Sequence, residues 1–153
     1  MDNTSRIDSV ASLEAAYHSQ IPISAHMGIR VTSWANDSLL LRAPLANNIN
    51  HQQSAFGGSL FSIAALAGWG LLQLKLNSVN IKTNTVIADG DVSYRRPVFT
   101  DFECRCTLPA SYAAFEATLR QKGKSALILT PQILVEGEVA MNFSGRYVVS
   151  VTE

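Results

Sequence analysis

The sequence predicts an α+β fold in which a curved antiparallel sheet of about six strands wraps around one long central helix. Residues 47–74 contain no Asp, Glu, Lys or Arg, although 16% of the chain is charged. The segments on both sides of this stretch alternate apolar and polar residues, which is the pattern of strands with one buried face. With 153 residues, 47% of them hydrophobic, the chain fits one domain, residues 1–153, with a substantial core.

The uncharged stretch also has the length of a membrane span, since the 21 residues from Ser54 to Leu74 are just sufficient to cross a bilayer. Glycine, serine and glutamine residues interrupt it, however, and its amphipathic neighbours need a core to cover their apolar faces. A helix that is apolar on nearly all sides is equally typical of the centre of a soluble protein. We therefore expect a buried helix from roughly Gly58 to Leu74.

The N-terminal part predicts a short helix followed by a hairpin. In residues 9–20 apolar side chains recur at helical spacing, and Pro22 stops the helix. Residues 29–45 form two apolar segments around Asn36 and Asp37, which are good turn formers.

Four further elements follow the central helix. A strand ends before Pro97, and a second strand alternates cleanly. The next segment, residues 111–122, fits either a strand or a helix by its apolar spacing. A helix is favoured, because the segment is rich in alanine and Gly123 follows at the place where such a helix should end. The strand, the second strand, the helix and a final long hairpin are expected at residues 86–95, 101–108, 111–122 and 125–151.

Charge and cysteine content narrow the function classes. Twelve basic and twelve acidic residues cancel, so no basic face for nucleic acid is indicated, whereas a near-neutral, apolar surface favours self-association. Cys104 and Cys106 share one face of a predicted strand, and the three histidines add no metal-ligand pattern, so no metal site is expected. Two small core residues in a reducing compartment are the simpler interpretation. The N-terminus has no apolar signal core, which favours the cytoplasm.

Two segments carry a family resemblance: NHQQSAFGGSLFSIAALAGWG, residues 50–70, and VSYRRPVFTDFEC, residues 92–104. The first resembles the Asn and His-Gly-Gly signature of hotdog-fold acyl-CoA thioesterases, with Phe56 at the usual histidine position. The second is similar to the strand with a Tyr-x-x-Pro-Val ending that follows the helix in that superfamily. The Phe-Gly-Gly form, the LAGWG segment and the closing FSGRYVV most resemble the putative thioesterases related to the YiiD C-terminal domain.

This resemblance implies a hotdog fold and a hydrolase acting on acyl-CoA or acyl-carrier-protein thioesters. It also implies a homodimer or higher homo-oligomer with the site at the dimer interface. No cofactor, membrane or nucleic-acid partner is expected. One departure matters: Ala65 stands where many members of the superfamily carry a catalytic carboxylate on the helix.

Gly57 and Gly58 begin the central helix, where unpaired N–H groups and the helix dipole favour a developing oxyanion. Glycines also allow a carbonyl to approach the backbone closely, although two glycines often do no more than turn a chain into a helix. The resemblance assigns Asn50 to orienting the attacking water or the thioester carbonyl, and Gln53 is a further candidate water ligand. For both side chains the alternative is a plain loop position.

Asp89 and Asp91 are the candidates for the missing base, because carboxylates on a central strand are seldom buried without a role. In a poorly solvated cleft such a carboxylate becomes a useful general base. The alternative is a wet face, or ion pairs with Arg95 or Arg96.

Substrate contacts are expected from Phe56 and from Arg95 or Arg96, since Arg suits the phosphates of coenzyme A. Lys122 and Lys124 offer a second basic cluster, and a solvated surface is the alternative for both clusters. Two other functions compete with hydrolysis. A non-catalytic acyl-CoA-binding or regulatory module would fit the absent helix carboxylate, and a hydratase or dehydratase of acyl thioesters is less favoured because it needs a histidine and an acid.

Overall fold

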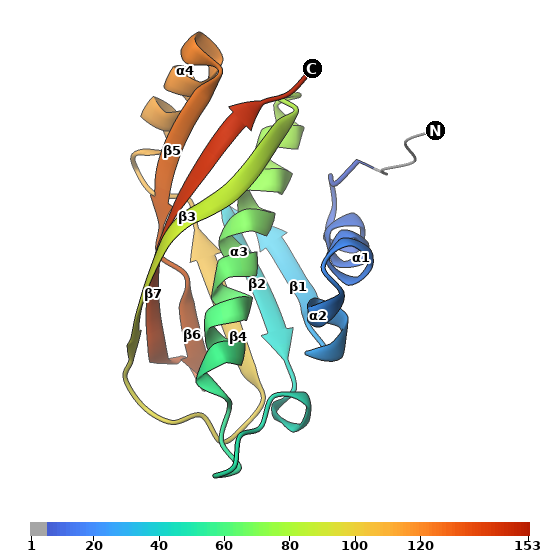
Figure 1. Cartoon of the computed structure of the whole chain (residues 1–153), viewed down its shortest axis with the longest axis vertical. Helices are drawn as coiled ribbons and strands as arrows, with labels where there is room; N and C mark the ends of the chain where they lie inside the picture. The colour runs from blue at the N-terminus through green and yellow to red at the C-terminus, as the bar shows by residue number, and fades with distance from the viewer. Residues whose placement is uncertain (1–5) are drawn as a thin grey trace.

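The computed structural model describes residues 6–153 and confirms an α+β hotdog fold in which a curved antiparallel sheet wraps one long helix (Figure 1). The helices are α1 (Val10–Gln20), α2 (Pro22–His26), the 3-10 turn η1 (Leu45–Asn47), α3 (Gly57–Ser78) and α4 (Tyr112–Lys122). The strands are β1 (Arg30–Ala35), β2 (Ser38–Ala43), β3 (Thr83–Tyr94), β4 (Phe102–Thr107), β5 (Lys124–Leu129), β6 (Gln132–Val135) and β7 (Glu138–Val151).

The strands form one seven-stranded sheet in the order β1-β2-β4-β6-β7-β3, and β5 pairs with β7 beside β6. The seventh strand arises because the first arm of the predicted final hairpin is split at Thr130 and Pro131. Proline has no N–H to donate to a sheet and so interrupts strand pairing. The predicted β1–β2 hairpin is confirmed, with Asn36 and Asp37 both at positive φ in its turn.

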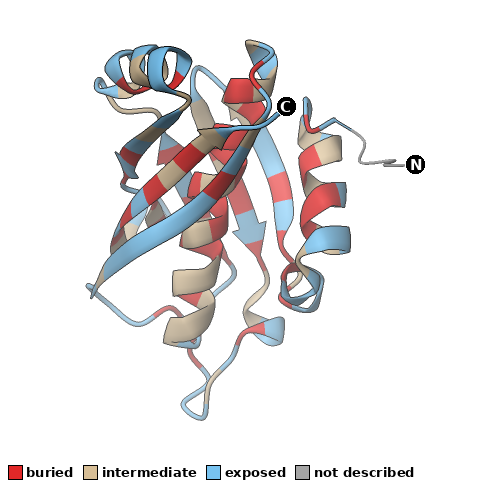
Figure 2. Cartoon of the chain, turned by 45° about the horizontal axis from the view of Figure 1, so that its top comes forward, coloured by how far each residue is buried: buried red, intermediate tan, exposed pale blue. Residues whose placement is uncertain are grey.

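Helix α3 is the long uncharged helix expected from the sequence, and the sheet curves around it. It is long and apolar enough to cross a membrane, and 67% of its most apolar 18-residue window is buried inside the fold. Figure 2 shows that burial is concentrated in the C-terminal half, whereas the first turns are only partly covered. The start of this helix is therefore the part that remains accessible.

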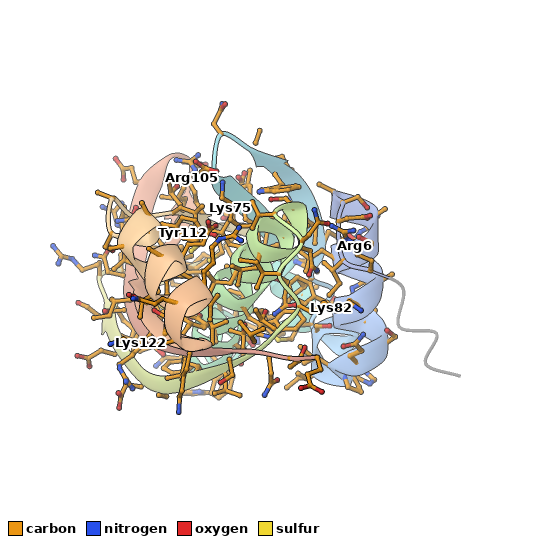
Figure 3. The ribbon with its side chains drawn as sticks, turned by 90° about the horizontal axis from the view of Figure 1, so that it is seen from above. Arg6, Lys75, Lys82, Arg105, Tyr112 and Lys122 are labelled. Carbon is orange, nitrogen blue, oxygen red and sulfur yellow. The ribbon has the colours of Figure 1, made fainter. Side chains whose placement is uncertain are left out.

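Near the C-terminal end of α3, Lys75 contacts both α4 and the β1–β2 turn. Lys75 on α3 lies 5.5 Å from the centre of the Tyr112 ring on α4 and 3.4 Å from a carboxylate oxygen of Asp37 (Figure 3). Gly123 ends α4 with φ +75°, as predicted. Figure 1 shows that this end of α3 and its first turn, at Gly57, lie at opposite ends of the molecule.

The two edges of the sheet differ. At the β1 edge, the Glu14 side chain on α1 accepts a hydrogen bond from the N–H of Val31 at 2.9 Å, and Nε2 of His18 lies 2.7 Å from the carbonyl of Ile29. Side chains of α1 thus satisfy backbone groups that an edge strand leaves unpaired. Strand β3 forms the opposite edge and, within the described residues, pairs only with β7.

Strand β3 carries a bulge that changes its faces. The pairing with β7 shifts between Ile87 and Asp89, so Ala88 is the extra residue. Simple alternation along the strand would place Val86 and Gly90 on one face, but the bulge separates them: Val86 is 53% exposed, whereas Gly90 lies against Phe61 of α3.

Candidate active site

The start of α3 offers two free backbone donors. Within residues 6–153, neither the N–H of Gly57 nor that of Gly58 donates a hydrogen bond. The N-cap residue, Phe56, provides no side-chain acceptor. These are donors that a helix leaves unpaired at its N-terminus, where the helix dipole is positive, so they suit a developing negative charge.

The backbone around these donors is firmly held. The N–H of Phe56 donates to the carbonyl of Asn48 at 2.7 Å, and the carbonyl of Phe56 accepts from the N–H groups of Ser59 and Leu60. The hydroxyl of Ser62 donates to the carbonyl of Gly58 at 2.8 Å. The helix start is thus fixed except for the two donors that remain available.

A hollow of about 380 Å³ lies beside this helix start. Its walls combine the beginning of α3 with the end of β3 and the loop that follows it. The lining residues are Ala55, Gly57, Leu60, Tyr94, Arg95, Arg96, Pro97 and Val98. An apolar wall with a few convergent polar groups is typical of a small-molecule site.

Tyr94 is the group in this hollow that the sequence interpretation did not assign. Its hydroxyl donates to the carbonyl of Gly57 at 2.8 Å, from a strand 37 residues further along the chain. Partial burial raises the pKa of Tyr94 above its usual value, so the phenol stays protonated at neutral pH. The Tyr-x-x-Pro-Val ending marked this residue but gave it no role.

Both predicted arginines line the hollow, and they differ in their partners. Arg96 forms an ion pair with Glu138. Within the described residues, the guanidinium of Arg95 has no ion pair or hydrogen bond, so its charge is available to a ligand. Lys122 lies on α4, at the opposite end of the molecule from the start of α3 (Figures 1 and 3).

Asn50 lies in the loop before α3, and its side chain is used to shape that loop. The Oδ1 atom accepts hydrogen bonds from the N–H groups of Gln52, at 2.8 Å, and Ser54, at 3.1 Å, and Nδ2 lies 2.9 Å from Oγ of Ser54. Gln53 is exposed in the same turn with φ +63°. Neither predicted water ligand lines the hollow, and their roles in the reaction remain predictions.

Asp89 and Asp91 lie away from the helix start. Within the single chain the prediction of a central strand is wrong, because β3 is an edge strand. The two carboxylates alternate with inward-facing Gly90 and so lie on the outer face, where the Asp89 side chain is 78% exposed. Asp89 pairs with Arg146 at 3.9 Å rather than with the expected arginines. The two aspartates line a second hollow of about 380 Å³ with Ile128, Ser144 and Arg146, but the exposure of Asp89 shows that this hollow is well solvated in the single chain.

Phe56 and Ala65 occupy the positions where the resemblance expects a histidine and a carboxylate. The Phe56 ring is 57% exposed and lies over Gly58, where an added Cβ would be 2.4 Å from a ring carbon. Ala65 carries no functional side chain, and its carbonyl accepts a hydrogen bond from the Tyr147 hydroxyl at 2.7 Å. Across residues 6–153, no group of three or more His, Cys, Asp or Glu side chains is placed to hold a metal ion.

A family model and a solved structure that match this chain are both described as putative thioesterases. The family described as "Putative thioesterase (yiiD_Cterm)" matches residues 10–151. A solved structure from Shewanella oneidensis, described as a putative thioesterase, is 33% identical, covers 94% of this chain and 97% of its own, and superposes with a TM-score of 0.85.

Two further structures agree with this match. A protein of unknown function from Chlorobaculum tepidum is 32% identical over 94% of both chains, with a TM-score of 0.87. A Pseudomonas aeruginosa protein described as a probable thioesterase is 25% identical, covers 92% of this chain and 94% of its own, and has a TM-score of 0.80.

Proposed function

Because the chain belongs to the family of putative thioesterases related to the YiiD C-terminal domain, we propose that it hydrolyses acyl-CoA thioesters at the start of α3. The observation that carries this proposal is the pair of free N–H groups at Gly57 and Gly58 beside a partly apolar hollow. The thioester carbonyl oxygen accepts hydrogen bonds from these donors. These hydrogen bonds become stronger as water attacks the carbonyl carbon and the oxygen gains negative charge.

Cleavage of the thioester C–S bond completes the proposed reaction. The attacking water releases one proton to the solvent, and collapse of the tetrahedral intermediate then breaks the C–S bond and gives a thiolate and a carboxylic acid. A thiol has a pKa of about 8.5, so the sulfur leaves without prior protonation. Among the described residues, neither a carboxylate nor an imidazole lines the hollow, and stabilisation of the oxyanion therefore supplies the main rate enhancement in this proposal.

The apolar residues and the arginines that line the hollow orient the substrate. The acyl chain lies against Leu60, Pro97 and Val98, and the phosphates of coenzyme A lie near Arg95, whose charge is free. Replacing Arg95 with Gln should raise KM for acyl-CoA and weaken its dependence on salt. Replacing Arg96 should have the smaller effect, because Glu138 already neutralises it.

We place the working enzyme in a homodimer joined through β3. Its edge is 12 residues long, and Val86 and Ile87 on it are 53% and 40% exposed. An unpaired edge of this kind is a template for a second strand. Pairing of two β3 strands would also bring the neighbouring subunit close to the hollow at the end of β3. A monomer in sedimentation velocity experiments at micromolar concentration would contradict this assembly.

The deciding experiment is steady-state hydrolysis across acyl-CoA substrates of increasing chain length, with Gly58→Val as the inactive control. Valine at this position would displace the Phe56 ring and crowd the carbonyl. We expect the parent protein to hydrolyse at least one substrate well above the buffer rate and Gly58→Val to be inactive while it remains folded.

A non-catalytic acyl-CoA-binding module is the second candidate function. The observation that favours it is Ala65 at the place of the helix carboxylate, together with the absence of a carboxylate from the described lining of the hollow. Calorimetric binding of acyl-CoA with no turnover across the whole set of chain lengths would establish this alternative in place of hydrolysis.

A further inference from the structure

Tyr94 is bonded to the same peptide unit that supplies one of the two proposed oxyanion donors. The carbonyl of Gly57 and the N–H of Gly58 belong to one planar peptide, and in a trans peptide they point in opposite directions. The Tyr94 hydroxyl holds this carbonyl at 2.8 Å. Fixing the oxygen at one end therefore fixes the direction of the N–H at the other.

The Gly57–Gly58 peptide is the first of α3 and receives a further restraint from outside the helix. It joins two glycines, whose backbone angles are the least restricted of all residues. Rotation of the unit would remove the donor and present a carbonyl oxygen in its place. Both peptides lie within α3, and each carbonyl also accepts from a hydroxyl: that of Gly58 from Ser62 of the same helix, and that of Gly57 from Tyr94 of β3.

The ring of Tyr94 adds a steric restraint to the hydrogen bond. A Cβ placed on Gly57 would lie 3.2 Å from Cζ and Oη of Tyr94, so the ring lies directly against this glycine. Gly57 thus allows the phenol to reach the first carbonyl of the helix. The raised pKa of Tyr94 keeps the donor proton on the hydroxyl through the neutral range.

We propose that Tyr94 is a positioning residue that holds the Gly57–Gly58 peptide with the Gly58 N–H directed at the oxyanion. This inference rests on the proposed thioesterase function and adds a residue to it. The hydrogen bond to the carbonyl also polarises the peptide, which makes its N–H a better donor. Tyr94 acts through the peptide and does not exchange a proton with the substrate.

The test is Tyr94→Phe, with Tyr147→Phe as the matched control. Both variants remove one tyrosine hydroxyl that donates to a carbonyl of α3, but Tyr147 bonds to Ala65, two turns from the helix start. We expect Tyr94→Phe to lower kcat roughly 10- to 100-fold with KM changed less than about twofold. Tyr147→Phe should leave both constants within about twofold of the parent, because its hydroxyl does not contact the donors.

Two further readouts separate positioning from general damage. A coenzyme A trifluoromethyl ketone, whose hydrate mimics the tetrahedral intermediate, should lose affinity for Tyr94→Phe by the same factor as kcat/KM. A thioether analogue of the substrate should bind unchanged.

The outcomes distinguish a failure of the proposed role of Tyr94 from a failure of the proposed thioesterase function. Equal kcat in Tyr94→Phe and in an active parent protein would overturn the role of Tyr94 and leave the thioesterase function intact. Equal loss of affinity for both analogues would also overturn it, since it would indicate a binding contact. A parent protein that hydrolyses no acyl-CoA would overturn the proposed function and this inference together.

Discussion

Replacing Gly68 with Ala should destabilise the protein, although alanine is normally the better helix residue. A Cβ at position 68 would lie 2.2 Å from Oη and 2.3 Å from Cζ of Tyr147. The ring cannot withdraw easily, because Tyr147 is 1% exposed and its hydroxyl is bonded to the carbonyl of Ala65. The helix and the ring therefore compete for the same space.

The magnitude follows from three contributions. Overpacking of a close-packed core costs about 1–3 kcal/mol. Displacing the ring also breaks the hydrogen bond to Ala65, which contributes about 1 kcal/mol. The gain in helix propensity from Gly to Ala offsets about 1 kcal/mol. The net loss is about 2 kcal/mol, and for a chain of this length it lowers Tm by about 4–8 °C.

The assay is urea unfolding of a double-mutant cycle with Tyr147→Leu, which removes the outer atoms of the ring. In that background Gly68→Ala should become stabilising by about 1 kcal/mol, because the propensity gain remains and the clash is gone. Full stability of Gly68→Ala in the parent background, or an equal cost in both backgrounds, would refute the reasoning.

Three further predictions concern the site and the core. Asp89→Asn and Asp91→Asn should each leave kcat within about twofold, since both carboxylates are exposed on the outer face; a loss of two or more orders of magnitude in steady-state assays would instead make one of them the base. Asn50→Ala should lower turnover by loosening the loop before α3, and parent-like rates with every acyl-CoA tested would remove Asn50 from the site. Burial raises the pKa of Cys106 from 9.0 to about 12, so the unfolded chain loses this proton first and stability falls between these pH values by about 1.4 kcal/mol per unit; Cys106→Ala should show a shallower loss in urea unfolding above pH 9.

The sequence predicted the parts of the fold whose causes are local. Helix α3 followed from an uncharged stretch, the β1–β2 hairpin from Asn36 and Asp37, and the end of α4 from Gly123. The position of β3 at the sheet edge was not predictable in this way, because it depends on which strands pair across the whole chain. The bulge at Ala88 was not predictable either, because an alternating pattern of apolar and polar residues is interpreted as a strand in which every residue is paired in register.

For the candidate site, Gly57 and the two arginines named from the sequence line one hollow, whereas the arrangement of the groups around it could not be predicted. The side chain of Asn50 is directed at its own loop, and the aspartates face outward, because hydrogen-bond direction and strand face are set by tertiary structure. Tyr94 was missed because its partner, Gly57, is 37 residues away. Only the folded chain brings them together.

The closed edge at β1 has a consequence for how copies of this chain can accumulate. In the proposed dimer two identical β3 edges pair antiparallel and leave neither free, while at the start of each β1 edge α1 contacts the N–H of Val31 through Glu14 and the carbonyl of Ile29 through His18. If the proposed β3 dimer forms, further strand-to-strand addition is therefore disfavoured at its two outer edges. Helix α1 thus protects against the polymerisation to which a sheet with two open edges is prone.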